Sequence, residues 1–126
     1  MTTDGAPTKA DDRELPVPLV WRPVIQQVVE HLRGDQGRAV GVPGVRPVSA
    51  ETSKQIQEYV ADYGETLVSL PEASWETSIA SWTGEGWDVL VDLWTEREGR
   101  SDLVLHLQVQ ERGPGYEFEV YMVYVP

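Results

Sequence analysis

The first half of the chain carries apolar residues at helical spacing. From Pro18 to Gly34, one apolar stripe recurs every fourth residue and consists of Val20, Val24, Val28 and Leu32. This stripe predicts a first helix that stops at Gly34. A second helix is expected from Ser49, which suits an N-cap, to Gly64, which suits a C-cap, with an apolar face of Ile56, Tyr59, Val60 and Tyr63. The Gly- and Pro-rich residues 35–48 are expected to form the loop between them.

The second half of the chain alternates between apolar and polar residues. Period-two runs occupy residues 87–94, 103–110 and 116–124, and Gly-containing stretches separate them. Such runs are typical of an antiparallel meander, to which the segment ending at Trp82 adds a strand. We predict an α+β fold: two N-terminal helices packed on one face of a four-stranded antiparallel β-meander. Residues 17–126 would form this single domain, behind a flexible polar tail of residues 1–16.

Four of the five tryptophans lie around the tetrapeptide TGEG at residues 83–86. If this tetrapeptide closes a hairpin, Trp82 faces Trp87 and Trp75 faces Trp94. Opposed residues point to the same side of a sheet, so each couple is a cross-strand aromatic pair. Trp82 and Trp87 share the side of the core residues, and Trp75 and Trp94 are expected on the outer face.

The register of the remaining strands groups polar residues on this outer face. The alternation allows two registers for the middle hairpin, one with Asp92 opposite His106 and one with Asp92 beside Val104. We adopt the first, and the last hairpin then sets His106 opposite Glu119. The predicted outer row consists of Asp92, His106 and Glu119, flanked by Trp94 and Tyr121.

A histidine between two carboxylates has a stabilised imidazolium and can act as an acid, a base or a partner contact. The more ordinary interpretation of the predicted outer row is an ion cluster on a solvated face, because structural ion networks perturb pKa values as well. The sequence has no metal-ligand spacing that joins His31 to His106, and no nucleophile motif around Ser101. We therefore expect no metal, no cofactor and no catalytic residue.

Composition narrows the class of partner. The 10 Lys and Arg residues against 21 Asp and Glu residues give a net charge of −11, which repels nucleic acid and steers basic proteins toward the surface. With no cysteine, disulfides and thiolate metal sites are excluded. No apolar run approaches the roughly 18 residues of a membrane span, and the first residues lack the apolar stretch of a secretory signal. We expect a cytoplasmic protein that binds neither nucleic acid nor membrane.

The segment WTEREGRSDL at residues 94–103 carries a family resemblance, together with residues 49–52, 63–75 and 116–126. These segments resemble a family of small bacterial proteins described as a domain of unknown function, and the resemblance implies no activity. Within the motif, Glu98 precedes Gly99, which suits a loop position with positive φ. Arg100 and Asp102 are expected to pair across the mouth of this loop.

Two functional hypotheses follow. The first is a non-enzymatic interaction domain that binds a basic protein through an acidic, aromatic outer face formed by Trp75, Trp94, Asp92, His106, Glu119 and Tyr121. Small, acidic, cysteine-free domains of this build resemble immunity proteins that neutralise toxins. The alternative is a small-molecule-binding or isomerase-like domain with a pocket between the helices and a curved sheet. An exposed patch over a filled interior favours the first hypothesis, and an enclosed cavity with a few polar groups favours the second.

Overall fold

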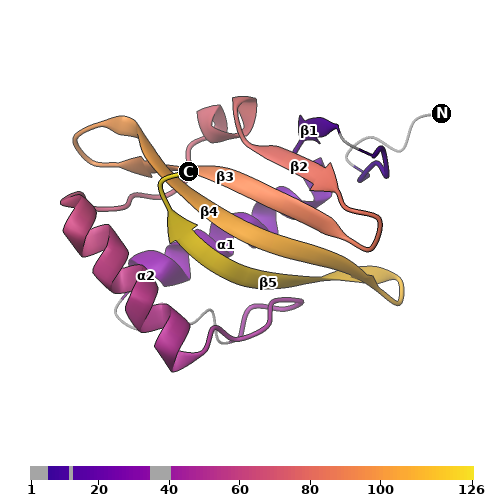
Figure 1. Cartoon of the computed structure of the whole chain (residues 1–126), viewed down its shortest axis with the longest axis horizontal. Helices are drawn as coiled ribbons and strands as arrows, with labels where there is room; N and C mark the ends of the chain where they lie inside the picture. The colour runs from indigo at the N-terminus through magenta and orange to yellow at the C-terminus, as the bar shows by residue number, and fades with distance from the viewer. Residues whose placement is uncertain (1–5, 12, 35–40) are drawn as a thin grey trace.

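The computed structural model describes residues 6–11, 13–34 and 41–126. Figure 1 shows the elements, which follow one another in the order β1 (Glu14–Pro16), α1 (Arg22–Arg33), α2 (Ala50–Tyr63), β2 (Ile79–Trp82), β3 (Trp87–Thr95), β4 (Gly99–Arg112) and β5 (Gly115–Tyr124). Two short 3-10 turns precede α1 and β2, at Leu19–Trp21 and Glu72–Glu76. Of the loop predicted at residues 35–48, residues 35–40 lie outside the described part of the chain.

The strands form one antiparallel sheet in the order β1-β2-β3-β4-β5. The α+β class with two helices is confirmed, and the number of strands is corrected from four to five. The added strand is β1, in which Leu15 lies opposite Ala80. Its three residues end at a proline, so they are too few to display the period-two pattern that identifies a strand.

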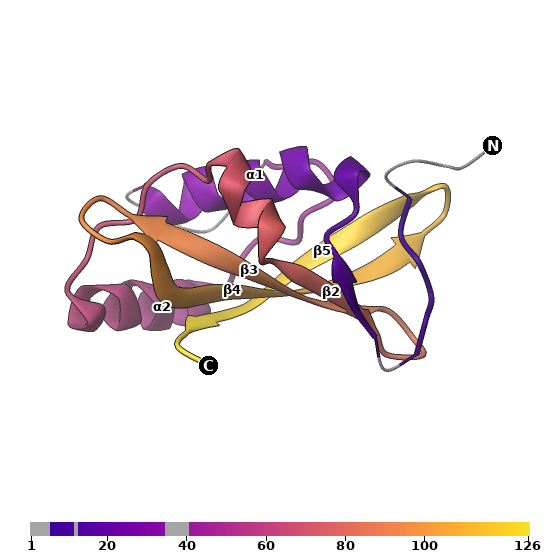
Figure 2. The same ribbon diagram turned by 90° about the horizontal axis from the view of Figure 1, so that it is seen from above.

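The two helices take different places around the sheet. Figure 2 shows α1 across one face and α2 beside the edge strand β5, with which α2 is in contact. The prediction that both helices pack on one face is therefore corrected for α2. We call the face toward α1 the inner face and the opposite one the outer face. No described helix lies over the outer face in Figures 1 and 2.

The ends of α2 follow the residue types found there. The Ser49 hydroxyl accepts a hydrogen bond from the backbone N–H of Thr52 at 3.1 Å, as an N-cap does. At the other end, Gly64 adopts a left-handed conformation with φ 86° and donates its N–H to the carbonyls of Val60 and Ala61. Both predicted ends of the helix are confirmed.

The core lies between α1 and the inner face of the sheet. Along β3, buried inner-facing residues alternate with half-buried outer ones. The buried apolar residues are Trp87, Val89, Val91 and Leu93. Trp21 stands edge-on to three aromatic rings, with centroid distances of 5.1 Å to Trp87, 5.4 Å to Tyr116 and 6.0 Å to Phe118. Trp82 lies opposite Trp87 in the hairpin, with ring centroids 4.7 Å apart. The predicted Trp82–Trp87 pair is confirmed.

Residues before β1 also contact this aromatic core. The indole N–H of Trp87 donates to the carbonyl of Thr8 at 3.0 Å. The Lys9 ammonium lies 5.1 Å from the centroid of the Trp82 ring and 2.8 Å from a carboxylate oxygen of Glu111. The division into a tail (1–16) and a domain (17–126) stays a prediction, and these contacts are what a deletion of the tail would remove.

Candidate functional site

The register of β3 and β4 differs from the one adopted from the sequence. Asp92 lies opposite Val104, and His106 lies opposite Leu90. Two registers that differ by two residues bury the same side chains, so the alternation pattern could not choose between them. The structure has the second of the two predicted registers, and Asp92 is not a neighbour of His106 across the strands.

The register of β4 and β5 is also corrected. Glu119 lies opposite Gln108, and His106 lies opposite Met122. The pairing shifts between His106 and Leu107, because Leu107 pairs with Val120 and leaves Tyr121 as an extra, unpaired residue of β5. The predicted outer row of Asp92, His106 and Glu119 is therefore wrong.

The bulge at Tyr121 reverses the alternation in the rest of β5. Val123, which strict alternation places outside, is fully buried, whereas Met122 and Tyr124 are only partly buried. Since Met122 is the cross-strand partner of His106, both belong to the outer face. The bulge thus adds a methionine and a tyrosine to the surface around His106, and the sequence pattern gave no sign of it.

His106 is held by two hydrogen bonds at the centre of the outer face. Its Nε2 lies 3.3 Å from Oδ1 of Asp88, and its Nδ1 lies 3.1 Å from the hydroxyl oxygen of Tyr124. A carboxylate only accepts, so Nε2 carries the proton toward Asp88, and in the neutral ring Nδ1 accepts from Tyr124. The Tyr121 ring packs 4.9 Å from the imidazole centroid. His106 is thus held in one orientation by its neighbours, and only 17% of its side chain is exposed.

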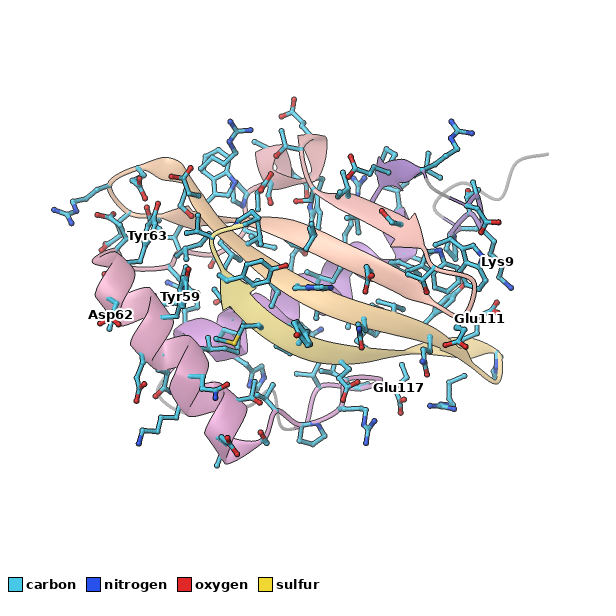
Figure 3. All side chains as sticks on the ribbon, in the orientation of Figure 1. Lys9, Tyr59, Asp62, Tyr63, Glu111 and Glu117 are labelled. Atoms are coloured by element: carbon cyan, nitrogen blue, oxygen red, sulfur yellow. The ribbon has the colours of Figure 1, made fainter. Side chains whose placement is uncertain are left out.

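Tyr121 is the most exposed aromatic residue of this surface, with 59% of its area accessible. Partly buried apolar residues share the outer face with it, namely Ile79 of β2, Leu90 of β3, and Met122 and Tyr124 of β5. Figure 3 looks onto this open face and shows side chains standing on strands that no helix covers. The outer face therefore carries aromatic and aliphatic side chains on both sides of His106.

Carboxylates border this surface, and some of them already have a cationic neighbour. Glu117 accepts a hydrogen bond from Nη2 of Arg112 at 2.6 Å, and Glu119 lies 3.7 Å from Nη1 of Arg46. The hydrogen bond from Arg112 holds the pKa of Glu117 below its usual 4.5; desolvation opposes this effect, and the charges of Arg112 and Arg46 add to it. Asp88 faces His106, and 44% of its side chain is exposed.

Asp92 belongs to a structural contact at the edge of β3. Its carboxylate accepts a hydrogen bond from the Thr77 hydroxyl, and its backbone N–H donates to the Ser78 hydroxyl at 2.9 Å. The Ser74 hydroxyl donates to the Asp92 carbonyl at 2.6 Å. β2 begins only at Ile79. The Ser74 and Ser78 hydroxyl groups therefore bond the backbone of β3 at Asp92, where no residue of β2 pairs with it.

The two tryptophans predicted for the outer face are not a pair. Trp75 lies in the 3-10 turn before β2, is only 4% exposed and belongs to the core. The guanidinium of Arg22 sits 5.4 Å from the centroid of its ring. Trp94 is half-buried and lies opposite Arg100, and its buried indole N–H has no hydrogen-bond partner among the described residues. The predicted contact role of Trp75 on an outer surface is corrected, because its ring is covered by its own chain.

The loop motif has a structural explanation centred on Tyr63. Its hydroxyl donates to Glu98 at 2.8 Å and accepts from the backbone N–H of Asp102 at 3.1 Å. The bond from Asp102 lowers the pKa of Tyr63, but the hydrogen bond to Glu98, desolvation and the two nearby carboxylate charges outweigh it and leave that pKa raised. Gly99 has φ 74°, and a Cβ there would lie 3.5 Å from the Trp94 ring. In the described part of the chain, Arg100 and Asp102 form no ion pair with each other.

Open hollows flank the sheet. One of about 480 Å³ lies between α2 and β5 at the border of the outer face, and is lined by Thr52, Gln55, Gln108, Glu119, Val120, Tyr121 and Met122. Within the described residues, no group of three or more His, Cys, Asp or Glu side chains is placed to hold a metal ion. None of the described helices is long and apolar enough to cross a membrane. Sequence reasoning missed Gln55, Tyr124 and the contact of Asp88 with His106, because these depend on the strand register and on where α2 packs.

Comparison with known families adds one finding. A family model described as a domain of unknown function (DUF7668) matches residues 29–126. The chain belongs to this family. The DUF7668 match covers α2, β2 to β5 and the predicted motif at residues 94–103, and it leaves β1 and Trp21 outside. Neither the curated proteins nor the solved structures that were compared gave a match to this chain.

Proposed function

We propose that this DUF7668 domain is a non-enzymatic interaction module that binds a basic protein through the outer face of its sheet. The observation that carries the proposal is the exposed ring of Tyr121, which stands 4.9 Å from His106 on a face that no described helix covers. An aromatic side chain raised from an open sheet by a bulge suits recognition better than stability, because stability gains only from rings that are buried.

The composition of the outer face supports this role. Aromatic residues are the usual energetic anchors of protein interfaces, and tyrosine adds a hydroxyl that can pair at the rim. Tyr121 and Tyr124 both contact His106, so the two rings are held in place before a partner arrives. A surface that is ordered in advance loses less conformational entropy on binding.

The charge of the domain supports the choice of partner. The chain carries a net charge of −11, and Asp88, Glu117 and Glu119 surround the aromatic residues of the outer face. A basic partner would be drawn to such a face at long range, and its association would slow as salt screens the carboxylates. An immunity protein that neutralises a basic toxin is one form that such a module takes.

The alternative function, a small-molecule-binding or isomerase-like domain, has less support. It requires a pocket between the helices and the sheet. In the core, the N-terminal helical segment packs on the sheet with no exposed side chain between them. The residues concerned are Trp21, Ile25 and Val28 on the helical side and Val89, Val91, Leu105 and Leu107 on the sheet. Complete burial of these side chains against one another favours recognition on the outer surface.

The test measures binding of a purified partner to matched variants. A partner captured by the wild-type domain from its own cell extract is purified and titrated by calorimetry against Tyr121→Ala and Val20→Ala. Val20 is a fair control because 51% of it is exposed in the 3-10 turn before α1. We expect Tyr121→Ala to weaken binding at least about tenfold, as the loss of a central aromatic anchor does, and Val20→Ala to change it less than about twofold. Equal effects of the two substitutions, or an acidic partner, would contradict the proposal.

A further inference from the structure

The hollow between α2 and β5 has a lining that suits one kind of side chain. Its volume of about 480 Å³ falls within the usual range for binding pockets. From α2 come Thr52 and Gln55, and from the sheet come Gln108, Glu119 and Tyr121. Residues that carry side-chain oxygen atoms thus line both sides of the hollow, together with the exposed Tyr121 and a methionine from the outer face.

Glu119 is the charged group of this lining. It lies directly opposite Gln108 across the strands, and 52% of its side chain is exposed. Its neighbour Arg46 approaches only to 3.7 Å, and 58% of that side chain is exposed. A pair of this length and exposure contributes little energy, so the carboxylate remains available to a second cation.

A guanidinium group matches this lining better than other groups do. It is planar, donates five hydrogen bonds in fixed directions, and stacks on aromatic rings, whereas an ammonium acts as a point charge. Carboxylate, amide and hydroxyl oxygens are the acceptors such a group needs. The nearby start of α2 does not offer a free N–H at Thr52 to an anion, because the Ser49 hydroxyl already accepts that hydrogen bond.

We propose that this hollow receives an arginine side chain of the basic partner, with Glu119 as the acceptor of its charge and Tyr121 as the ring it packs on. This inference rests on the proposed function and names the part of the partner that the outer face recognises. Since Arg46 already points a guanidinium toward Glu119, the partner's arginine would displace it and take its place.

The test uses a short arginine peptide, acetyl-Gly-Arg-Gly-amide, titrated into the ¹⁵N-labelled full chain and followed by NMR. We expect shifts centred on Gln55, Glu119, Tyr121 and Met122. The same peptide with lysine should bind more weakly, and the peptide with citrulline, the neutral analogue of arginine, should bind least. Equal binding of the arginine and citrulline peptides, preferred binding of a glutamate peptide, or shifts spread evenly over all acidic parts of the surface would overturn the inference.

Charge-matched variants sharpen the result. Glu119→Gln should raise the dissociation constant of the arginine peptide about three- to tenfold, while Glu76→Gln, at an exposed site in the 3-10 turn before β2, should leave it unchanged. Arg46→Gln should tighten binding by removing the competing guanidinium, and Arg100→Gln should not. An equal effect within either pair would show that net charge, and not this hollow, governs binding.

The two proposals fail in different ways. If the arginine peptide does not bind while the partner still depends on Tyr121, the inference about the hollow is wrong and the proposed function stands. If the peptide binds at the hollow but Tyr121→Ala leaves partner binding unchanged, the proposed role of the outer face is wrong. Binding of the arginine peptide to Gln55→Ala tests the hollow a second time, because this substitution removes a lining group from α2 without altering the aromatic surface.

Discussion

Replacing Trp87 by alanine should remove a large contribution to the aromatic core. The residue is 2% exposed, and its ring lies 5.1 Å from Trp21, 4.7 Å from Trp82 and 6.1 Å from Tyr116. Truncation of a buried large aromatic costs about 3–5 kcal/mol. Each aromatic contact adds about 0.5–1.5 kcal/mol beyond burial, and the indole hydrogen bond to Thr8 adds about 1 kcal/mol. We therefore expect a loss in the upper part of that range, about 4–5 kcal/mol.

Urea denaturation followed by far-UV circular dichroism measures this loss as a fall in the transition midpoint at unchanged slope. A loss below about 1 kcal/mol would refute the burial and the ring contacts on which the estimate depends. Because the whole domain is stabilised by only about 5–15 kcal/mol, the alanine variant can fail to fold. The milder Trp87→Phe keeps the test usable, since it preserves a ring and removes the indole N–H.

A double-mutant cycle then isolates the hydrogen bond between Trp87 and Thr8. Deletion of residues 1–10 removes the accepting carbonyl and leaves β1 in place. If the hydrogen bond forms, deletion should cost about 1 kcal/mol more in the wild-type protein than in Trp87→Phe. Equal costs in the two backgrounds would mean that the tail does not contact this indole.

Three further predictions concern the edges of the fold. Deleting residues 1–16, which the sequence alone predicts to be without effect, should lower Tm by at least about 4 °C in thermal melts, because β1 and its pairing with β2 are lost; an unchanged Tm would support the flexible tail. In Arg112→Gln, NMR titration should find the pKa of Glu117 closer to 4.5 than in the wild type. Since the folded pKa is depressed, this pair stabilises the fold above about pH 4.5 and loses that effect as the pH falls through the folded value, so unchanged titration curves would refute the pairing. Gly99→Ala should cost about 1–2 kcal/mol in urea denaturation, because φ is 74° there, and a neutral substitution would refute the turn geometry.

Local signals were enough to predict the helices and the first hairpin. Ser49 and Gly64 act within one turn of the helix that they delimit, so their chemistry alone marks its ends. The Trp82–Trp87 pair is separated by a tetrapeptide loop, and this short closure leaves little freedom in the register. In each of these cases, the residues that decide the structure are close together in the sequence.

The outer face was harder to predict, because its register depends on features that no side-chain pattern carries. One register sets Asp92 opposite His106 and the other sets it opposite Val104, and both keep every buried residue of β3 on the inner face. The bulge at Tyr121 is a backbone event in the middle of an apparently regular strand. Trp75 was assigned to a strand although it precedes β2 in a 3-10 turn. These shifts replaced the predicted outer row by the contacts of His106 with Asp88 and Tyr124.

The most direct test of the account is to map the surface that a bound partner protects. Backbone hydrogen exchange, read by NMR on the ¹⁵N-labelled domain with and without its purified partner, reports each amide separately. If the outer face is the interface, protection should increase at the border between β4 and β5, around His106 and Tyr121, while the exposed amides near Leu19 and Val20 stay unchanged. Protection confined to the first 3-10 turn and α1, with β4 and β5 unaffected, would contradict the account.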